Sequence, residues 1–382
     1  MSESLENNCL GTENDDLSRY LAKAAATQTP LSASFELTRR CNFRCVHCYL
    51  GSQEAIRQHQ YRELRTDAII ELLDEMVEAG TLFLTFTGGD PMLRPDFIRI
   101  YEHAVRIGLL VSVYCNGSLM TEAIAASFKK YPPRIVEITL YGATQKCFES
   151  ITQKTGSYAA CMKGISRLRE AGIRLRLKTI VITLNYNELP AIRAMVEDMD
   201  LQFRHDCSII PALPNEDNGG CTNIRNGGQD GLKELLRFRL NPEQAVAVDV
   251  SADRVKEKLR ELAIQEAAPT ELSKELYHCG AGRSSYHITP YGKMQPCVIT
   301  LRPSVDLVAK MQSLLESWNS LHEKFTKQKA GADFPCNSCV DNRLCTGCPS
   351  TFILETGGMA LASSFYCDYA KHRREASLLV TE

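Results

Sequence analysis

The feature that most constrains this chain is a run of three closely spaced cysteines near its amino terminus. Cys41, Cys45 and Cys48 follow one another in the pattern C-x3-C-x2-C. Three thiolates on one short loop can hold three corners of a cube-shaped iron–sulfur cluster, and a fourth thiolate would close it. A cluster held by three cysteines keeps one iron open for a substrate, much as catalytic metal sites keep one open position. A zinc loop that lacks its fourth ligand and three unrelated thiols are the alternatives.

The composition is that of an ordinary globular protein. The chain has 382 residues, of which 44% are hydrophobic and 24% charged, enough for two domains or one large barrel with an appendage. A net charge of −2 gives no broad attraction to nucleic acid or to an anionic membrane, and neither is expected as a partner. The start is acidic and polar, unlike a secretion signal, and no apolar run reaches the roughly 18 to 20 residues that span a bilayer. We therefore expect a cytoplasmic protein.

The sixteen cysteines favour metal binding over disulfides, because the cytosol keeps thiols reduced. A second group lies far from the first and consists of Cys279, Cys297, Cys336, Cys339, Cys345, Cys348 and Cys367. The C-x2-C pairs between Cys336 and Cys348, taken alone, also fit a compact zinc site. The remaining cysteines are expected to be ordinary buried or loop thiols: Cys9, Cys115, Cys147, Cys161, Cys207 and Cys221.

Strand-like and helical segments alternate through the first half of the chain. The hydrophobic pattern predicts strands at 34–38, 82–86, 109–114, 135–141, 175–183 and 203–210. It predicts helices between them at 67–79, 95–107, 121–130, 158–171 and 188–199. Short strand–helix repeats require parallel strands with right-handed crossovers, which an open doubly wound sheet or a partial barrel would satisfy. No G-x-G-x-x-G follows the first strand, and we predict an α/β fold with a partial (β/α)6 TIM-like barrel.

Four regions are predicted along the chain. They are an amino-terminal tail (1–30), the partial barrel (31–232, ending in an irregular loop at 211–232), a helical bridge (233–276, mostly one helix at 241–266) and a small cysteine-rich domain (277–382). The last region is short of regular elements, so metal clusters would supply much of its stability.

Polar motifs follow the first three predicted strands. The cysteine loop follows the first strand, Gly88-Gly89-Asp90 the second and Asn116-Gly117 the third. Each of the last two is typical of a turn when taken alone. Chemistry in barrels of this kind collects at the carboxyl ends of the strands, so their common position predicts a binding site at this edge.

The cysteine triplet resembles the signature of radical S-adenosylmethionine (SAM) enzymes, in which the open iron of a 4Fe–4S cluster chelates SAM through its amino and carboxylate groups. The resemblance implies that Cys41, Cys45 and Cys48 bind this cluster. It also implies an oxidoreductase that cleaves SAM reductively to a 5′-deoxyadenosyl radical, which takes hydrogen from an unreactive carbon.

Further residues match the positions that this family uses to bind SAM. His47 occupies a slot near the adenine where an aromatic residue is usual. Gly88-Gly89-Asp90-Pro91 resembles the Gly-Gly-Glu-Pro motif, whose acid accepts from the SAM ammonium group; aspartate reaches one methylene less far. The resemblance thus assigns SAM contacts to His47, Gly88, Gly89, Asp90, Asn116 and Thr139, with the Thr139 hydroxyl on the ribose.

The seven carboxyl-terminal cysteines resemble the SPASM domain, an auxiliary-cluster extension of radical SAM enzymes that modify peptides and proteins. That pattern assigns the first auxiliary 4Fe–4S cluster to Cys279, Cys297 and Cys348. It assigns the second to Cys336, Cys339, Cys345 and Cys367. The first cluster has only three evident ligands, which leaves one iron open to substrate, to another side chain or to water. Two residues separate Cys345 from Cys348, where three are usual.

Residues 34–367 as a whole resemble the radical SAM/SPASM maturases of ribosomally made peptides (RiPPs). Such enzymes introduce thioether or carbon–carbon crosslinks, or related oxidative changes. The resemblance implies a precursor peptide as substrate and an external electron donor of the flavodoxin or ferredoxin type. The thirty or so residues before the first strand are too few for a peptide-recognition domain, so a separate recognition protein or another surface is expected to bind the peptide.

Three alternatives remain. An anaerobic sulfatase-maturating (formylglycine-forming) enzyme would carry an acidic residue directly after Cys297, where this chain has Val298. A radical SAM dehydrogenase acting on a small molecule is the second. A non-catalytic metal-binding or electron-relay protein is the third, and it would not need the SAM-binding motifs. The sequence does not identify the catalytic acid or base; Tyr141, Lys178, Arg204 and Asp206 are candidates. Arg204 and Asp206 point to one side of an alternating strand, either into the barrel or as a structural ion pair.

Overall fold

The computed structural model describes residues 23–24, 26–214, 232–251, 253–264, 276–309 and 312–379. Most of the predicted tail and of the predicted loop at 211–232 lies outside these residues, as do Cys9 and Cys221. No helix within the described ranges is long and apolar enough to cross a membrane.

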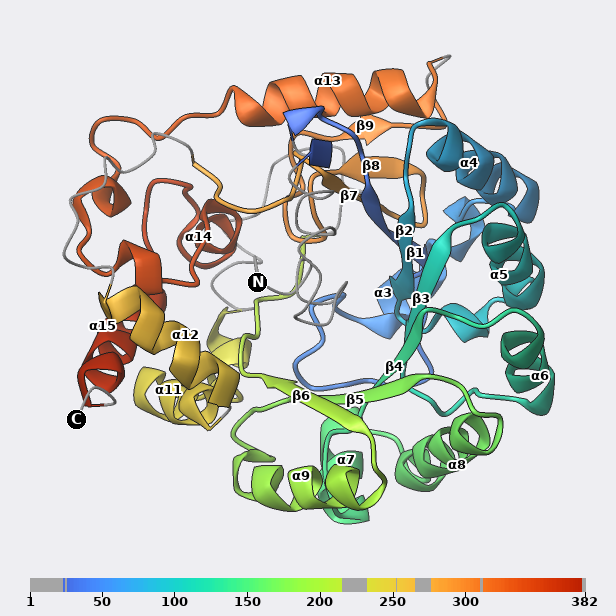
Figure 1. Cartoon of the computed structure of the whole chain (residues 1–382), viewed down its shortest axis with the longest axis horizontal. Helices are drawn as coiled ribbons and strands as arrows, with labels where there is room; N and C mark the ends of the chain where they lie inside the picture. Colours follow the sequence, from blue (N-terminus) through green and yellow to red (C-terminus); the bar gives the residue numbers. More distant parts are fainter. Residues whose placement is uncertain are drawn as a thin grey trace.

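The described strands form a single nine-stranded sheet in the order β6-β5-β4-β3-β2-β1-β7-β8-β9. Six parallel strands make up the barrel part: β1 (Ser32–Thr38), β2 (Phe83–Gly88), β3 (Leu110–Cys115), β4 (Ile135–Thr139), β5 (Leu175–Ile180) and β6 (Gln202–Asp206). The sheet curves around a central space, and helices cover its outer side (Figure 1). The predicted α/β partial barrel is confirmed.

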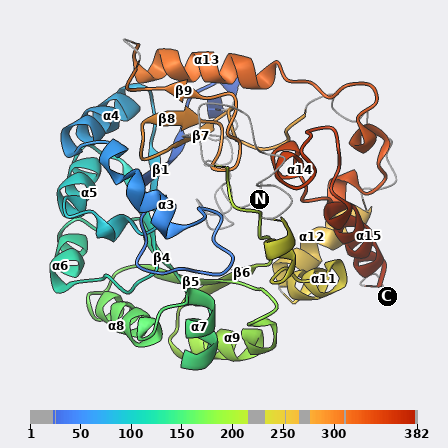
Figure 2. The same cartoon turned by 180° about the vertical axis from the view of Figure 1, so that it is seen from behind.

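The outer helices agree with the predicted ones to within about two residues. They are α4 (Thr66–Glu78), α5 (Phe97–Arg106), α6 (Glu122–Lys130), α8 (Ser157–Glu170) and α9 (Leu189–Asp198). Two short helices were not predicted, α3 (Gln53–Gln58) after the cysteine loop and α7 (Gln145–Thr152) after β4. Both are visible from behind in Figure 2. They are too short for a helical period to stand out in the sequence.

The two faces of the barrel sheet differ in polarity. Residues such as Phe35, Phe86, Val113, Ile138 and Leu177 are fully buried in the main hydrophobic core. The alternate positions along the same strands carry polar side chains that line an inner cavity: Ser34, Thr85, Thr87, Ser112, Tyr114, Glu137, Thr139, Lys178 and Arg204. Because strand side chains alternate between faces, the same strands build both an apolar core and a polar interior.

The carboxyl-terminal region continues the barrel sheet. Strand β7 (Ser285–Ile288) pairs in parallel with β1, and β8 (Lys293–Gln295) and β9 (Val305–Asp306) add two antiparallel strands. Helix α13 (Leu314–Thr326) packs against α4 and β8. This region therefore has more regular structure than the sequence suggested, and it is joined to the barrel by a continuous ladder. The four-region division of the chain remains a prediction.

Four more helices lie on the open side of the barrel (Figure 1). They are α11 (Pro242–Val250), α12 (Asp253–Ile264), α14 (Pro349–Thr356) and α15 (Ser364–Leu379). The single helix predicted at 241–266 is thus two helices. Helix α15 packs against α11, where Arg373 forms an ion pair of 2.5 Å with Asp249. The bridge and the carboxyl-terminal helix therefore hold each other in place.

Gly164 allows α8 to approach the turn at the end of β3. A Cβ atom at this position would lie 1.9 Å from the backbone oxygen of Gly117. We predict that Gly164→Ala lowers the free energy of unfolding by about 2 kcal/mol, although alanine favours a helix interior by roughly 1 kcal/mol. Gly331→Ala is the control, because a Cβ there meets nothing within 4 Å. Equal stability of the two variants in urea unfolding would contradict the close packing.

Candidate active site and cysteine clusters

A cavity of about 1910 Å³ occupies the polar interior of the barrel. The described residues that line it come from the cysteine loop, from the inner face of the barrel strands and from the carboxyl-terminal region. Its size is above the usual range of single-ligand pockets, roughly 300–1,000 Å³. The cavity therefore has room for a cosubstrate and a substrate together.

The three cysteines of the amino-terminal loop face this cavity together. Burial raises the pKa of the Cys41 thiol to about 12, with smaller contributions from Asp90 and Cys48. Burial also raises the pKa of Cys45, with Cys48 and Cys41 adding to the effect, so the three sulfurs are close neighbours. The backbone N–H of Phe43 and the side-chain amide of Asn116 donate to the Cys41 sulfur at 3.4 and 3.8 Å. Such donors suit the thiolate ligands of an iron–sulfur cluster.

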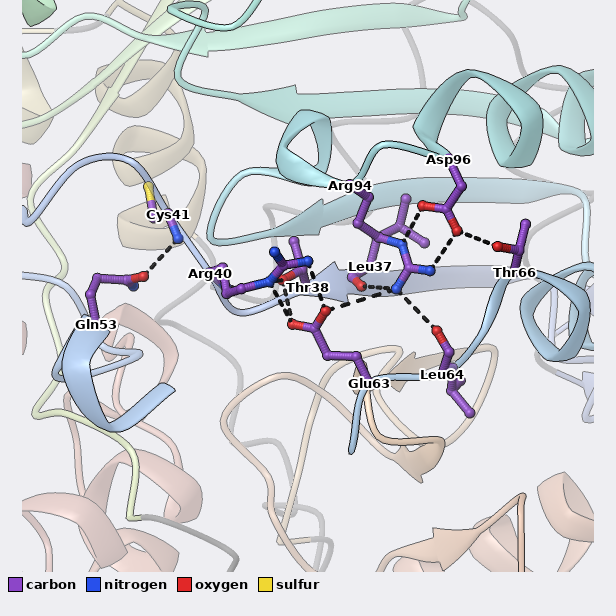
Figure 3. A network of polar contacts seen from close by, with 10 residues as sticks. All are labelled: Leu37, Thr38, Arg40, Cys41, Gln53, Glu63, Leu64, Thr66, Arg94 and Asp96. Carbon is purple, nitrogen blue, oxygen red and sulfur yellow. Dashed lines mark hydrogen bonds and ion pairs between the residues drawn. The ribbon is translucent and has the colours of Figure 1, made fainter. Parts of the chain in front are cut away.

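Gln53 of α3 holds the beginning of the cysteine loop (Figure 3). Its side-chain oxygen accepts the Cys41 N–H at 2.7 Å, and its amide donates to the Arg39 carbonyl at 3.2 Å. The Gln53 side chain is buried, so losing these bonds would leave polar backbone groups unsatisfied. No sequence pattern indicates this role of Gln53, because it depends on a turn that brings α3 back to the loop.

An ionic network supports the loop from its other side (Figure 3). Arg40 pairs with Glu63 at 3.0 Å, and Thr38 donates to the same carboxylate at 2.5 Å. Arg94 pairs with Asp96 at 2.7 Å and donates to the Leu37 and Leu64 carbonyls at 3.2 and 3.1 Å. These contacts fix the end of β1, from which the cysteine loop departs.

The glycine motif after β2 packs directly on the cysteine loop. A Cβ at Gly88 would lie 2.0 Å from the Thr38 oxygen, and one at Gly89 would lie 2.2 Å from the Arg40 oxygen. Gly88 also has a φ of +134°, which other residues rarely adopt. Backbone bonds from Gly89 N to Thr38 O (2.8 Å) and from Asp90 N to Arg40 O (2.9 Å) close the contact. The glycines are therefore required by close backbone packing, and both line the cavity.

Asp90 lies beneath the cavity surface. It is fully buried, and its two oxygens accept the backbone N–H groups of Met92 and Asn116, each at 3.0 Å. Burial raises the pKa of Asp90 to about 6, against the effect of these two hydrogen bonds. In this arrangement the carboxylate joins the end of β2 to the end of β3. A direct contact between Asp90 and SAM remains a prediction, whereas Asn116 and the half-buried Thr139 do line the cavity.

His47 lies on the cavity wall beside Tyr141. Their ring centroids are 5.2 Å apart in an edge-to-face arrangement. Burial lowers the pKa of His47 to about 4, so its imidazole is neutral near pH 7. Its buried Nδ1 has no hydrogen-bond partner among the described residues. A neutral, apolar-packed ring fits the predicted position against a nucleoside base.

The carboxyl-terminal cysteines lie close to other members of their predicted sets, and the assignment of each set to a cluster remains a prediction. Cys279, Cys297 and Cys348 line the same cavity as the amino-terminal loop, as does Cys345 of the other set. Burial raises the pKa of Cys279 and Cys297, and the nearby Cys348 thiol adds to both shifts. The Ile299 N–H donates to the Cys297 sulfur at 3.4 Å. The other set is linked in the same way through Cys345, whose pKa is raised mainly by burial and also by its three neighbours: Cys336, Cys339 and Cys367.

No group of three or more His, Cys, Asp or Glu side chains within the described ranges is placed to hold a single metal ion. A tetrahedral zinc site would need such a group. Thiolates around a cubane bind different iron atoms, so they are spread farther apart. The clusters and the compact zinc site that the C-x2-C pairs also allowed both stay predictions. Ligation by each cysteine remains a prediction.

A charged group on β4–β6 was not foreseen as a unit. Glu137 is fully buried and pairs with Arg176 at 2.6 Å, with Lys178 at 3.0 Å and with Arg204 at 2.6 Å. Burial opposes ionisation of Glu137, but Lys178 and Arg204 outweigh it and lower its pKa to about 2. Arg204 thus pairs with Glu137, and Asp206 accepts the Ser208 N–H at 2.7 Å. We name Glu137, Arg176, Lys178 and Arg204 the β4–β6 wall.

Comparison with known proteins agrees with this geometry. The Radical SAM superfamily model matches residues 35–197. An AdoMet-dependent heme synthase of Methanosarcina barkeri is 23% identical over 353 residues, which cover 90% of this chain and 98% of that protein. The subtilosin biosynthesis protein AlbA of Bacillus subtilis is 29% identical over 273 residues, 71% of this chain but only 55% of AlbA.

Among solved structures, the chain is similar to SuiB of Streptococcus suis bound to S-adenosylmethionine. The TM-score is 0.62 at 14% sequence identity, over 94% of this chain and 82% of SuiB. A second SuiB structure, bound to its precursor peptide SuiA, gives the same TM-score at 13% identity, over 95% of this chain and 86% of SuiB. At these identities the similarity shows a shared fold.

Gln53→Ala tests the support of the cysteine loop. Loss of two buried hydrogen bonds should cost the loop about 1–3 kcal/mol and lower the rate of 5′-deoxyadenosine formation about tenfold. Gln58→Ala, an exposed glutamine on the same helix, should leave the rate unchanged. Iron content and SAM cleavage would be measured on anaerobically reconstituted protein. A Gln53→Ala enzyme with wild-type activity would show that the loop needs no such anchor.

The lowered pKa of Glu137 predicts a specific pH dependence of stability. Its ionised form stabilises the fold above pH 4.5, and this stabilisation is lost as the pH falls toward the folded pKa of about 2. The shift corresponds to about 3 kcal/mol, of which about 2 kcal/mol should be lost between pH 6 and pH 3. Glu137→Gln should lack this component in urea unfolding, whereas exposed Glu234→Gln should behave like wild type. If the free energies of unfolding of wild type and Glu137→Gln changed with pH in the same way, this prediction would be refuted.

Proposed function

Because residues 35–197 match the Radical SAM superfamily and the chain is an enzyme with a radical SAM domain, we propose that it is a maturase of ribosomally made peptides. It would cleave SAM reductively, abstract hydrogen from a precursor peptide and so lead to a thioether or carbon–carbon crosslink or a related oxidation. Enzymes of this superfamily use a 4Fe–4S cluster and SAM. Two auxiliary 4Fe–4S clusters on the carboxyl-terminal cysteines are part of the proposal.

The observation that carries the proposal is the shared cavity. Three cysteines of the amino-terminal loop and four of the carboxyl-terminal region (Cys279, Cys297, Cys345 and Cys348) line one space of about 1910 Å³. A small-molecule pocket needs neither this size nor a second set of thiols in its wall. A substrate that gives up electrons after hydrogen abstraction would lie between the two sets.

The residues of this chain would position the cluster ligands and keep water out of the site. When bound on Cys41, Cys45 and Cys48, the cluster supplies the electron that breaks the carbon–sulfur bond of SAM. Asn116 and the Phe43 N–H steady the Cys41 sulfur, and the buried ring of Phe43 and the partly buried ring of Tyr141 keep water from the loop. The exposed position of Cys367 would bring the second auxiliary cluster within reach of an external electron carrier.

The proposal also includes a precursor peptide as the partner. The SuiB structure with SuiA shows that a protein of this fold binds a peptide, and AlbA acts in the biosynthesis of a bacteriocin. A separate recognition protein for the peptide, and an electron donor of the flavodoxin or ferredoxin type, complete the proposed set.

A small-molecule substrate is the second candidate. The alignment with the heme synthase spans almost the whole of both proteins, whereas the alignment with AlbA leaves nearly half of AlbA uncovered. The cleanest test incubates holoenzyme, SAM and reductant with short peptides encoded beside its gene. A parallel incubation uses Fe-coproporphyrin III, the porphyrin in the name of another similar protein, the Fe-coproporphyrin III synthase of Methanosarcina barkeri. Loss of two hydrogen atoms per crosslink in a peptide, seen by mass spectrometry, supports the maturase. Conversion of the porphyrin without any peptide product would contradict the maturase and support a small-molecule substrate.

Two cysteine variants should separate the proposed clusters. Cys45→Ala should lose about four irons and abolish 5′-deoxyadenosine formation. Cys367→Ala should also lose about four irons, but it should keep SAM cleavage and lose peptide product. Iron analysis and chromatography of the cleavage products would measure both effects.

Cys161→Ala is the matched control, since Cys161 is buried in the core and lies in neither set. It should keep the full complement of about twelve irons. A Cys45→Ala protein that still cleaves SAM would remove the basis of the proposal, and unchanged iron content in Cys367→Ala would remove the auxiliary assignment.

A further inference from the structure

The cavity is much more positive than the chain as a whole. The described residues that line it include nine Lys or Arg side chains and five Asp or Glu side chains, a net charge of +4. The whole chain has a net charge of −2. A concave site with an excess of one sign of charge attracts ligands of the opposite sign. The part of this charge with the most clearly defined geometry is the β4–β6 wall.

The β4–β6 wall gathers three cations around one carboxylate. Glu137 Oε1 contacts Lys178 Nζ at 3.0 Å and Arg204 Nη2 at 2.6 Å. Its Oε2 contacts Arg176 Nη2 at 2.6 Å and Arg204 Nε at 2.9 Å. Both carboxylate oxygens of Glu137 therefore contact cationic nitrogens, and its side chain has no exposed surface. Even with Asp206 included, which acts on Lys178 and Arg204 from the same face, the group keeps a positive charge.

Two cationic side chains of the wall are partly exposed to the cavity, whereas the Glu137 carboxylate is not exposed. The Arg204 side chain is 31% exposed and Lys178 is 20% exposed, against 0% for Glu137. A guanidinium group has five N–H donors, and the nitrogens of Arg204 that contact Glu137 are Nε and Nη2. The Lys178 ammonium also lies 4.6 Å from the centre of the Tyr114 ring. Planar guanidinium donors in a sheltered cavity suit a carboxylate ligand.

The wall lies next to the predicted SAM position, on the same inner face of the barrel strands. Glu137 precedes Thr139 by two residues on β4, so the two side chains share a face about 7 Å apart. Lys178 pairs in register with Thr139 and with Arg204. In the radical SAM enzymes that the cysteine triplet resembles, the carboxylate of SAM binds the open iron at the cysteine loop. The charge of the wall is then available to a different anion.

We propose that the β4–β6 wall is a substrate subsite, in which Arg204 and Lys178 bind a carboxylate group of the molecule that is modified. The reaction itself rests on the proposed function, whereas the subsite rests on the geometry and charge of the wall. The same chemistry is found in an Asp or Glu side chain of a peptide and in a propionate of a tetrapyrrole. In either case the ion pair would fix the substrate beside the SAM position.

Two matched pairs of probes test the subsite on reconstituted holoenzyme with SAM and without reductant. One pair is a fluorescein-labelled Gly-Ser peptide with a Glu-Glu-Glu stretch and its Gln-Gln-Gln counterpart. The other is Fe-coproporphyrin III and its tetramethyl ester. At least one acid should bind about tenfold more tightly than its neutral counterpart, and Arg204→Gln should remove that preference. The pair that shows the preference identifies the source of the carboxylate.

Further variants separate recognition from damage to the fold. Asp206→Asn removes a negative charge from the same face and should strengthen binding of the acid several-fold, opposite in sign to Arg204→Gln. Arg204→Lys should keep part of the preference, and Arg99→Gln, on an exposed arginine of α5, should keep all of it. Equal binding of acids and neutral counterparts by wild type overturns the proposal. So does an Arg204→Gln enzyme that keeps the preference, or one whose only defect is weaker SAM binding.

Failure of the subsite is distinguishable from failure of the proposed function. Wild-type 5′-deoxyadenosine formation under reductant reports on SAM cleavage whether or not any probe binds. If SAM is cleaved but no acid is preferred, the subsite falls and the radical SAM reaction stands. If an acid is preferred but SAM is never cleaved, the subsite stands and the proposed reaction falls.

Discussion

The backbone contact between the Gly88-Gly89 turn and the cysteine loop is the constraint on which the rest of the site depends. It requires two glycines in succession, because a Cβ at either would lie within 2.2 Å of a carbonyl oxygen of the loop. Asp90 carries the contact onward by accepting the Asn116 N–H at the end of β3. The loop, the turn and β3 are thus joined directly by hydrogen bonds. Three cysteines on a loop would otherwise have the freedom of any surface segment, and a cluster with one open iron needs fixed ligands.

The second organising feature is the alternation of polarity along the barrel strands. Side chains on one face build the core under the outer helices, and those on the other face leave a polar interior. An open barrel with a polar lumen accepts large, charged substrates that a closed, apolar barrel would exclude. The carboxyl-terminal strands and helices complete the enclosure, because β7 extends the sheet from β1 and brings Cys279 and Cys297 to the same space. The fold thereby places two sets of thiols around one cavity.

The periodic and clustered features of the fold could be predicted from the sequence. The six barrel strands and five outer helices, and the grouping of the cysteines, follow from local patterns that a single chain displays. The missing features depend on contacts between distant residues. Glu137 meets Arg204, 67 positions away, and Ser34 of β1 meets His287 of β7, 253 positions away. Gln53 looks like any helical glutamine until the turn returns it to Cys41. Asp90 was expected to face a ligand, and only the folded chain shows both its oxygens on backbone N–H groups.

The central claim is that Cys41, Cys45 and Cys48 hold a cluster whose fourth iron binds SAM. Electron paramagnetic resonance of the anaerobically reduced enzyme, recorded before and after addition of SAM, tests this claim most directly. A Cys336→Ala, Cys279→Ala double variant would reduce the overlap from auxiliary clusters. The account predicts that SAM changes the signal of the remaining cluster and that an excess of adenosine, which lacks the chelating amino and carboxylate groups, does not reproduce the change. A signal that is identical with and without SAM would contradict it.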